Sequence, residues 1–253
     1  MIRIENTVRP SGEQWKAAIM GARNPMNSWD KSDSGYCKGR SERCDNCCIN
    51  KEDDPCYFAN SYKGKFYVIG SKDLDLMKRL CKAGTDHRKF MRMLPVMATI
   101  TAPLYWWKQF STYKVGVVEN SCSTMHKISD KKFTLDDFSY EHLLHEANCV
   151  DKDILDYRGI KETPLGVLYL MISSLNLYRE CYIETRDKKY WWQMIQLLPS
   201  SYNQKRTVMM NYEVLANIYH SRKGHKIDEW NQFCSWIEKL PYSELIIGDE
   251  EKR

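Results

Sequence analysis

Short strand-like segments come early in this chain, and amphipathic helical segments come late. Residues 1–5 alternate between apolar and charged side chains, and residues 65–69 are a second short run rich in strand-forming residues. Residues 163–178 instead carry apolar side chains at helical spacing. A doubly wound sheet needs strands and helices in regular alternation, which this order does not offer. The order therefore predicts the α+β class.

Capping residues predict where the first helices begin. Ser11 and Gln14 have the spacing of a capping box, in which each side chain binds the other residue's backbone N–H. The apolar residues that follow form one stripe, Trp15, Ala18, Ile19 and Ala22. Ser71 is expected to cap the next helix, and Gly84 to end it in a left-handed conformation.

The second half of the chain is expected to be helical. Thr163 and Pro164 open a long helix, because proline suits the first helical turn. Residues 204–222 are expected to form one helix, with a set of residues close to one face: Val208, Asn211, Leu215, Ile218 and Arg222. An amide on such an apolar face would need hydrogen-bond partners. Asp228 is expected to cap the last helix, which ends at Pro241.

Charge and hydropathy narrow the classes of partner. Lys and Arg number 38 against 33 Asp and Glu, and the two signs are interspersed, so we expect no nucleic-acid partner. No segment reaches the roughly 20 apolar residues of a membrane helix, and the charged N-terminus does not resemble a signal peptide. We therefore expect no membrane association, a cytoplasmic location, and reduced cysteines.

Residues 31–64 are polar and have no apolar periodicity, so they are interpreted as an inserted Cys-rich loop within a single domain over residues 1–253. Four thiolates in this region can supply a tetrahedral Zn²⁺ site, namely Cys37, Cys44, Cys47 and Cys56. A structural metal would order a loop that has no core of its own. The alternative is a reduced, flexible insertion.

Residues 102–125 carry the most specific pattern in the chain, which otherwise lacks the common phosphate-loop, dinucleotide, zinc-protease and hydrolase motifs. They read APLYWWKQFSTYKVGVVENSCSTM. This segment resembles the signature of flavin-dependent thymidylate synthases, where an A-P-x-x-x-x-x-Q helix runs without a gap into R-H-R-x-x-S-x-N-E-x-S-x-R. A second similarity begins at Leu198-Pro199, with Asn211 and then Arg222 at the family's spacing, and residues 22–29 resemble the family's A-R-x-S-F turn.

The resemblance covers about two-thirds of the chain and implies a fold, a reaction and a site. The implied fold is a mixed sheet flanked by helices, in a homotetramer with shared sites. The implied reaction methylates dUMP at C5 with FAD, a reduced nicotinamide and methylene-tetrahydrofolate. The implied nucleotide contacts are Gln109, Ser121, Cys122, Ser123 and Arg222, of which Gln109 and Arg222 are catalytic candidates. Cys122 is a third catalytic candidate because of its thiol, since the family is not thought to need an enzymic nucleophile. The implied cofactor contacts are Tyr113, Lys114, Asn120 and Asn211.

The chain departs from the signature where the family carries its cations. Thr112-Tyr113-Lys114 stand in place of Arg-His-Arg, and Thr124 replaces the final arginine. Arginine binds phosphate through a planar fork that lysine cannot reproduce, so these changes weaken a pyrophosphate site. The alternative function is therefore a non-catalytic nucleotide-binding protein on the same fold.

Each singled-out residue also has a purely structural interpretation. Gln109 would be a solvent-facing helix residue, and Arg222 a favourable charge near a helix C-terminus. Cys122 stands where the family has a serine; a thiolate there would be able to attack C6 of a pyrimidine, whereas the structural alternative is a buried, inert thiol.

Overall fold

The computed structural model describes residues 1–37, 67–145 and 163–248. These residues form two compact units, each built from separate stretches of chain. The first unit contains Met1–Ile4, Ile100–Thr112 and Asn120–Arg206, and the second contains Glu5–Thr99, Tyr113–Glu119 and Thr207–Arg253. The single domain and the inserted loop at 31–64 stay predictions, because most of that loop lies outside the described residues.

A four-stranded sheet has the strand order β1-β4-β6-β5. Its strands are β1 (Arg3–Val8), β4 (Pro95–Pro103), β5 (Val118–Ser121) and β6 (Asn203–Asn211), and each strand contributes residues to both units. A second, two-stranded sheet pairs β2 (Gly35–Tyr36) with β3 (Tyr67–Val68) in antiparallel register. Together with the helices, these sheets confirm the α+β class.

Residues 204–211 form strand β6, so the prediction of one helix over 204–222 is wrong in its first half. Burial alternates along β6: Gln204, Val208 and Met210 are buried, whereas Lys205 and Met209 are exposed. That period of two is the strand pattern. Helix α8 (Tyr212–Arg222) begins only after β6 ends. A strand therefore follows the long helices, and the expected order of strands first and helices later is also wrong.

The second unit contains most of the helices. They are α1 (Gly12–Arg23), η1 (Asn24–Met26), η2 (Trp29–Lys31), α3 (Ser71–Lys82), η4 (Lys89–Met93), α8, α9 (Asp228–Glu238) and α10 (Glu244–Ile247). The Ser11–Gln14 capping box is confirmed, as is the buried stripe on α1. Three expectations need correction: Gly70 rather than Ser71 is the N-cap of α3, Ile227 rather than Asp228 is that of α9, and α10 follows as a further helix.

A buried ion pair ties α1 to α3 in the second unit. The Arg23 Nε donates to Asp73 Oδ1 at 2.5 Å, and both side chains are almost completely buried. The other carboxylate oxygen accepts hydrogen bonds from the hydroxyls of Ser32 and Ser34 and from the backbone N–H of Asp33 and Ser34. Burial alone would raise the pKa of Asp73, but these hydrogen bonds and the Arg23 charge outweigh it and lower that pKa.

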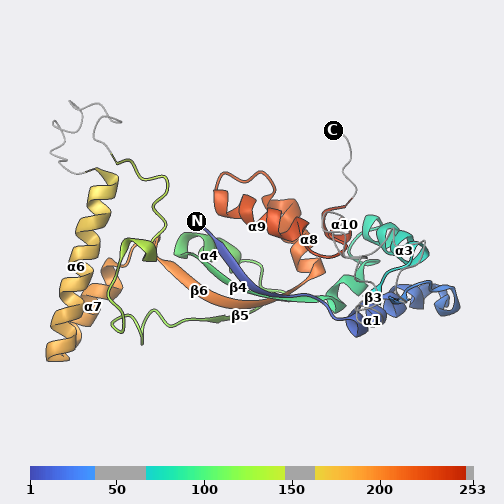
Figure 1. Cartoon of the computed structure of the whole chain (residues 1–253), viewed down its shortest axis with the longest axis horizontal. Coiled ribbons are helices and arrows are strands. Elements are labelled where there is room, and N and C mark those ends of the chain that lie inside the picture. The colour runs from blue at the N-terminus through green and yellow to red at the C-terminus, as the bar shows by residue number, and fades with distance from the viewer. Residues whose placement is uncertain (38–66, 146–162, 249–253) are drawn as a thin grey trace. The chain divides into compact units, whose positions relative to one another are not determined.

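The first unit is built on a helical hairpin of α6 (Pro164–Thr185) and α7 (Lys188–Leu197), drawn in yellow and orange in Figure 1. Thr163 caps α6 and Pro164 is its first residue, which confirms the predicted start. The hairpin packs on residues near η5 (Leu135–Asp137), in a cluster of Ile128, Phe133, Phe138, Leu165, Leu168, Ile172, Leu175 and Met194. Within the described part of the chain, no helix is long and apolar enough to cross a membrane.

Candidate functional site

Two predicted site residues, Tyr113 and Arg222, meet in the second unit although they lie far apart in the sequence. Arg222 is the last residue of α8, and its Nε donates to the Tyr113 hydroxyl at 2.8 Å. The guanidinium also lies over the ring of Trp230, a fully buried residue of α9, at 4.7 Å from the ring centroid. Cation–π contact of this kind stabilises a desolvated guanidinium. Arg222 is therefore held in place by its neighbours.

His225 is a third neighbour of Arg222, and sequence reasoning did not single it out. Its Nε2 lies 3.2 Å from Arg222 Nη1, and its Nδ1 accepts from the backbone N–H of Ile227 at 3.2 Å. A neutral imidazole has one acceptor nitrogen, so a single tautomer cannot accept from both donors. His225 therefore connects Arg222 to the backbone at Ile227, the N-cap of α9.

Asn211 is the N-cap of α8, and not a member of an apolar helix face as predicted. Its side-chain oxygen accepts from the backbone N–H of Val214 at 3.0 Å. A Cβ on Gly116 would lie 2.9 Å from Asn211 Nδ2, and Gly116 has a φ of +82°. Glycine is required there by both the space and the backbone conformation. The segment after Tyr113 thus packs against Asn211 at the start of α8, while Tyr113 itself contacts Arg222 at the end.

Lys114 lies in the same segment and is exposed. Its side chain has no hydrogen-bond or ion-pair partner among the described residues. The charge of Lys114 is therefore solvated and accessible to a ligand.

Cys122 belongs to the first unit and is exposed, so the structural alternative of a buried thiol is wrong. It follows directly after β5, and its backbone pairs with β6: the Cys122 N–H donates to Lys205 at 2.9 Å, and its carbonyl accepts from the Gln204 amide at 2.9 Å. Asn120, Ser121 and Ser123 are exposed beside it. The thiol is chemically accessible.

Arg206 is a cation of the first unit that sequence reasoning missed. Its guanidinium donates from Nε and Nη2 to Gln204 Oε1 at 3.0 and 2.9 Å, and lies 4.4 Å from the ring centroid of Trp107. Gln204 in turn holds the Cys122 carbonyl. Residues 203–211 have no apolar alternation in their sequence that would have placed these side chains on a strand.

Gln109 lies on α4 (Leu104–Phe110) in the first unit and is half-buried. The residues before and after it, Trp106, Trp107 and Phe110, are completely buried and anchor the helix. The predicted site residues therefore fall in two groups. Tyr113, Lys114, Asn211 and Arg222 belong to the second unit, and Gln109, Asn120, Ser121, Cys122 and Ser123 belong to the first.

Comparison with known proteins identifies the fold. No protein-family model and no curated protein matches the sequence. Among solved structures, thymidylate synthase X (ThyX) from Helicobacter pylori, crystallised with FAD and dUMP, matches with a TM-score of 0.58 and 14% identity over 97% of this chain and 96% of that one. A second structure of the H. pylori protein, complexed with FAD and dUMP, has a TM-score of 0.57 and 14% identity over 96% and 95%.

The chain has a ThyX-like fold. This agrees with the resemblance seen in residues 102–125 and 198–222, and at 14% identity it is a statement about fold. Of the predicted site residues, the structure brings Tyr113 and Arg222 into direct contact.

The predicted zinc site lies almost wholly outside the described residues. Cys44, Cys47 and Cys56 are not among them, and Cys37 is half-buried without a disulfide. Within the described ranges, no group of three or more His, Cys, Asp or Glu side chains is arranged to hold a metal ion. The zinc site stays a prediction.

Proposed function

We propose that this chain binds a pyrimidine deoxynucleotide such as dUMP and transfers a one-carbon unit to its C5 in a flavin-dependent reaction. The contact between Tyr113 and Arg222 carries the proposal. It brings the signature segment and the C-terminal arginine together, as they must be if both contribute to one site. The ThyX-like fold supports the proposal.

Arg222 is proposed as the main nucleotide contact. The Tyr113 hydroxyl and the Trp230 ring hold its planar guanidinium in place before any ligand arrives. A preorganised cation of this kind stabilises negative charge that develops on a ring oxygen as C5 becomes nucleophilic. The Gln109 amide and the hydroxyls of Ser121 and Ser123 are proposed to orient the nucleotide.

Cys122 is proposed as a nucleophile, and its exposure supports that role. Its thiolate would add to C6 of the pyrimidine, and the displaced electron pair would pass to C5 and the ring carbonyl oxygen. C5 would then attack the methylene carbon of the folate donor, and one carbon–nitrogen bond would break with its electron pair going to nitrogen. Loss of the C5 proton, release of tetrahydrofolate by cleavage of the second carbon–nitrogen bond, a two-electron reduction of the transferred carbon and expulsion of the thiolate would leave a methyl group on C5 and restore the ring.

Lys114, Asn120 and Asn211, with the Tyr113 ring, are proposed to hold FAD. Lys114 is suited to a phosphate group because it is exposed and cationic. When bound, FAD would supply the electrons that reduce the transferred carbon to a methyl group, with a reduced nicotinamide as their source and methylene-tetrahydrofolate as the carbon donor.

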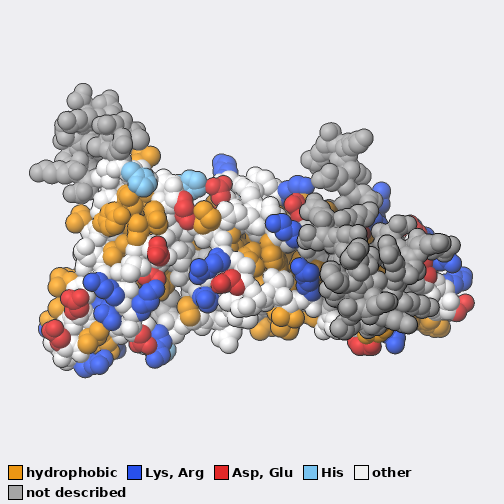
Figure 2. Space-filling view, in the orientation of Figure 1, with side chains coloured by type: hydrophobic (Ala, Val, Ile, Leu, Met, Phe, Trp, Pro, Cys, Tyr) orange, Lys and Arg blue, Asp and Glu red, His pale blue; other side chains and the backbone are white. Residues whose placement is uncertain are grey.

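The alternative is a nucleotide-binding protein that has lost the flavin reaction. Lys114 is the one cation between Thr112 and Thr124, where the family signature has three arginines and a histidine. A flavin pyrophosphate carries two negative charges, so this observation favours weaker flavin binding. Charged side chains of both signs are intermixed on the face shown in Figure 2, which favours a small ligand over a polyanion.

Titration with dUMP tests the nucleotide site. We expect Arg222→Ala to weaken dUMP binding by at least about tenfold, the typical value of a charge-assisted hydrogen bond. Arg92→Ala is the matched control, because Arg92 is exposed on η4. Equal dUMP affinity in the two variants would remove Arg222 from the site.

The visible spectrum of the protein after incubation with FAD and desalting separates the two functions. Retained flavin absorbance supports the enzyme. A colourless protein that still binds dUMP supports the binding protein.

We also propose that the chain forms a homo-oligomer through α6, as the resemblance to a tetrameric family implies. This helix is apolar on more than one side: Leu168, Ile172 and Leu175 are buried in the hairpin, whereas Leu170 and Leu177 are 56% and 55% exposed. A helix that is apolar all round is usually buried. A second copy of the chain would cover the exposed side.

A further inference from the structure

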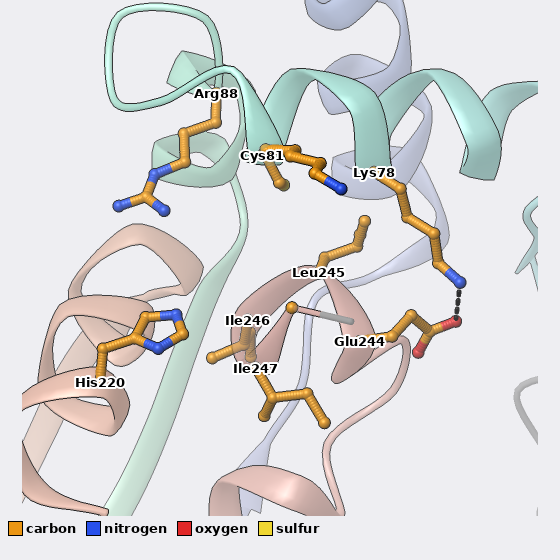
Figure 3. Close-up of a pocket in the computed structure, with 10 residues that line it drawn as sticks. Lys78, Cys81, Arg88, His220, Glu244, Leu245, Ile246 and Ile247 are labelled. Carbon is orange, nitrogen blue, oxygen red and sulfur yellow. Dashed lines mark ion pairs between the residues drawn. The ribbon is translucent and has the colours of Figure 1, made fainter. Parts of the chain in front are cut away.

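A cavity of about 230 Å³ lies in the second unit between α3, α8 and α10 (Figure 3). Its basic lining comes from Lys78, Lys82 and Arg88, with His220 on α8. Its apolar lining comes from Leu245, Ile246 and Ile247 on α10. We propose that this cavity binds a small carboxylate with an apolar body, at a site separate from the nucleotide site.

The basic side chains differ in how they are held. Arg88 is fixed, because its Nη2 donates to Glu213 Oε1 at 3.1 Å and to Asn217 at 3.3 Å. Lys78 lies 3.9 Å from Glu244, and both side chains are about one-third exposed, so this ion pair is weak. Lys82 has no ion-pair or hydrogen-bond partner among the described residues.

The charge balance fits one anionic group. Three basic side chains, Lys78, Lys82 and Arg88, line the cavity, and two acids offset them: Glu244 in the lining and Glu213 behind Arg88. One positive charge is left over, and the His220 ring adds a polar group to the same wall. A single carboxylate would balance this charge and accept hydrogen bonds from the lysine ammonium groups.

The opposite wall of the cavity selects for an apolar body. Ile247 is half-buried and keeps apolar surface exposed in this wall, whereas Leu245 and Ile246 are almost completely buried, and Figure 3 shows Leu245 pointing toward α3. Cys81 lies on α3 with Lys78 and Lys82, and burial raises the pKa of its thiol to about 12, so the thiol is neutral and unreactive. An apolar group placed here is removed from water, which favours binding.

The volume limits the size of the ligand. About 230 Å³ corresponds to roughly eight water molecules at ~30 Å³ each. Cavities that hold drug-sized ligands are commonly larger, about 300–1,000 Å³. The cavity therefore suits a ligand of the size of benzoate better than FAD or a nucleotide.

The cavity is separate from the Arg222 site. His220 and Arg222 are two residues apart on α8, and a helix turns about 100° per residue, so their side chains leave the helix on nearly opposite sides. None of the residues that hold Arg222, namely Tyr113, His225 and Trp230, lines the cavity.

Ligand-observed NMR titration with benzoate tests the proposal. Acetate is the probe that lacks the apolar body, and benzyl alcohol is the probe that lacks the charge. We expect saturable binding of benzoate with a Kd of about 1 mM or tighter, and weaker binding of both other probes. The double variant Lys82→Gln/His220→Gln should weaken benzoate binding about tenfold. Both side chains are exposed, so this variant is expected to fold.

Two further variants make the result specific. Lys16→Gln/His126→Gln removes the same groups from exposed positions outside the cavity and should leave the benzoate Kd unchanged. Arg222→Ala should also leave it unchanged, which keeps this test independent of the nucleotide site. Absence of saturable benzoate binding, equal affinity in the cavity variant and its control, or loss of binding in Arg222→Ala would each overturn the proposal.

Discussion

At the scale of single residues, Tyr113 positions Arg222. Tyr113→Phe keeps the ring and removes only the hydroxyl that accepts from Arg222 Nε. We expect dUMP affinity to fall about tenfold, because a hydrogen bond to a charged group contributes on the order of 1.5–3 kcal/mol. Tyr169→Phe, at an exposed position on α6, is the matched control and should have no effect. An unchanged dUMP dissociation constant in Tyr113→Phe would contradict the positioning role.

Gly116 provides a second test at the same scale. Gly116→Ala places a Cβ 2.9 Å from Asn211 Nδ2 at a φ of +82°, whereas Gly84→Ala meets a φ of +103° with no atom within 4 Å. Both variants are expected to lose about 1 kcal/mol from backbone strain, and Gly116→Ala to lose more because of the contact. Chemical denaturation measures the difference. Equal losses of unfolding free energy in the two variants would mean that the segment at Gly116 is not closely packed against Asn211.

At the scale of elements, the Arg23–Asp73 pair fixes α3 to the end of α1. Asp73→Asn leaves the Arg23 guanidinium buried without its counter-charge, so we expect the free energy of unfolding to fall by about 3–5 kcal/mol at pH 7. Asp75→Asn is the control, because the Asp75–Arg79 pair is exposed and worth little.

The same pair predicts a pH dependence. The pKa of Asp73 is lowered in the folded chain, so its contribution is complete above the ordinary carboxyl pKa of 3.8 and is lost as the pH falls through the lower folded value. Denaturation measured from pH 7 to acid should show a steeper loss below about pH 4 in the wild type than in Asp73→Asn. If the free energy of unfolding fell with pH in parallel in the wild type and in Asp73→Asn, this role of Asp73 would be contradicted.

The elements also show how far the sequence could predict the structure. Local signals were sufficient at α1 and α6, where a capping box and a proline determine the start of each helix. They failed at 204–211, because Val208, Leu215 and Ile218 have helical spacing that continues across a junction between strand and helix. Asn211 is that junction. Arg206 and His225 were missed because their partners come from tertiary packing, which no local spacing encodes.

At the scale of the whole molecule, the exposed side of α6 predicts self-association. Leu170→Glu/Leu177→Glu would place charges in an apolar interface and should shift the chain to a monomer in analytical ultracentrifugation. Met26→Glu/Met125→Glu adds the same charge at exposed methionines outside α6 and should leave the assembly intact. A wild-type monomer, or an unchanged assembly in the α6 variant, would contradict the α6 interface.

The proposed reaction takes place at a site whose signature segment has none of the family's arginines. The most direct test is the conversion of dUMP to dTMP by the purified chain supplied with FAD, a reduced nicotinamide and methylene-tetrahydrofolate. We expect dTMP formation by the wild type and by Arg92→Ala. In Arg222→Ala we expect the rate of dTMP formation to fall about 100-fold or more, because removing one preorganised charge-stabilising group typically costs that much in rate. A wild-type chain that forms no dTMP while binding dUMP would establish the binding protein instead, and one that does neither would contradict the nucleotide site.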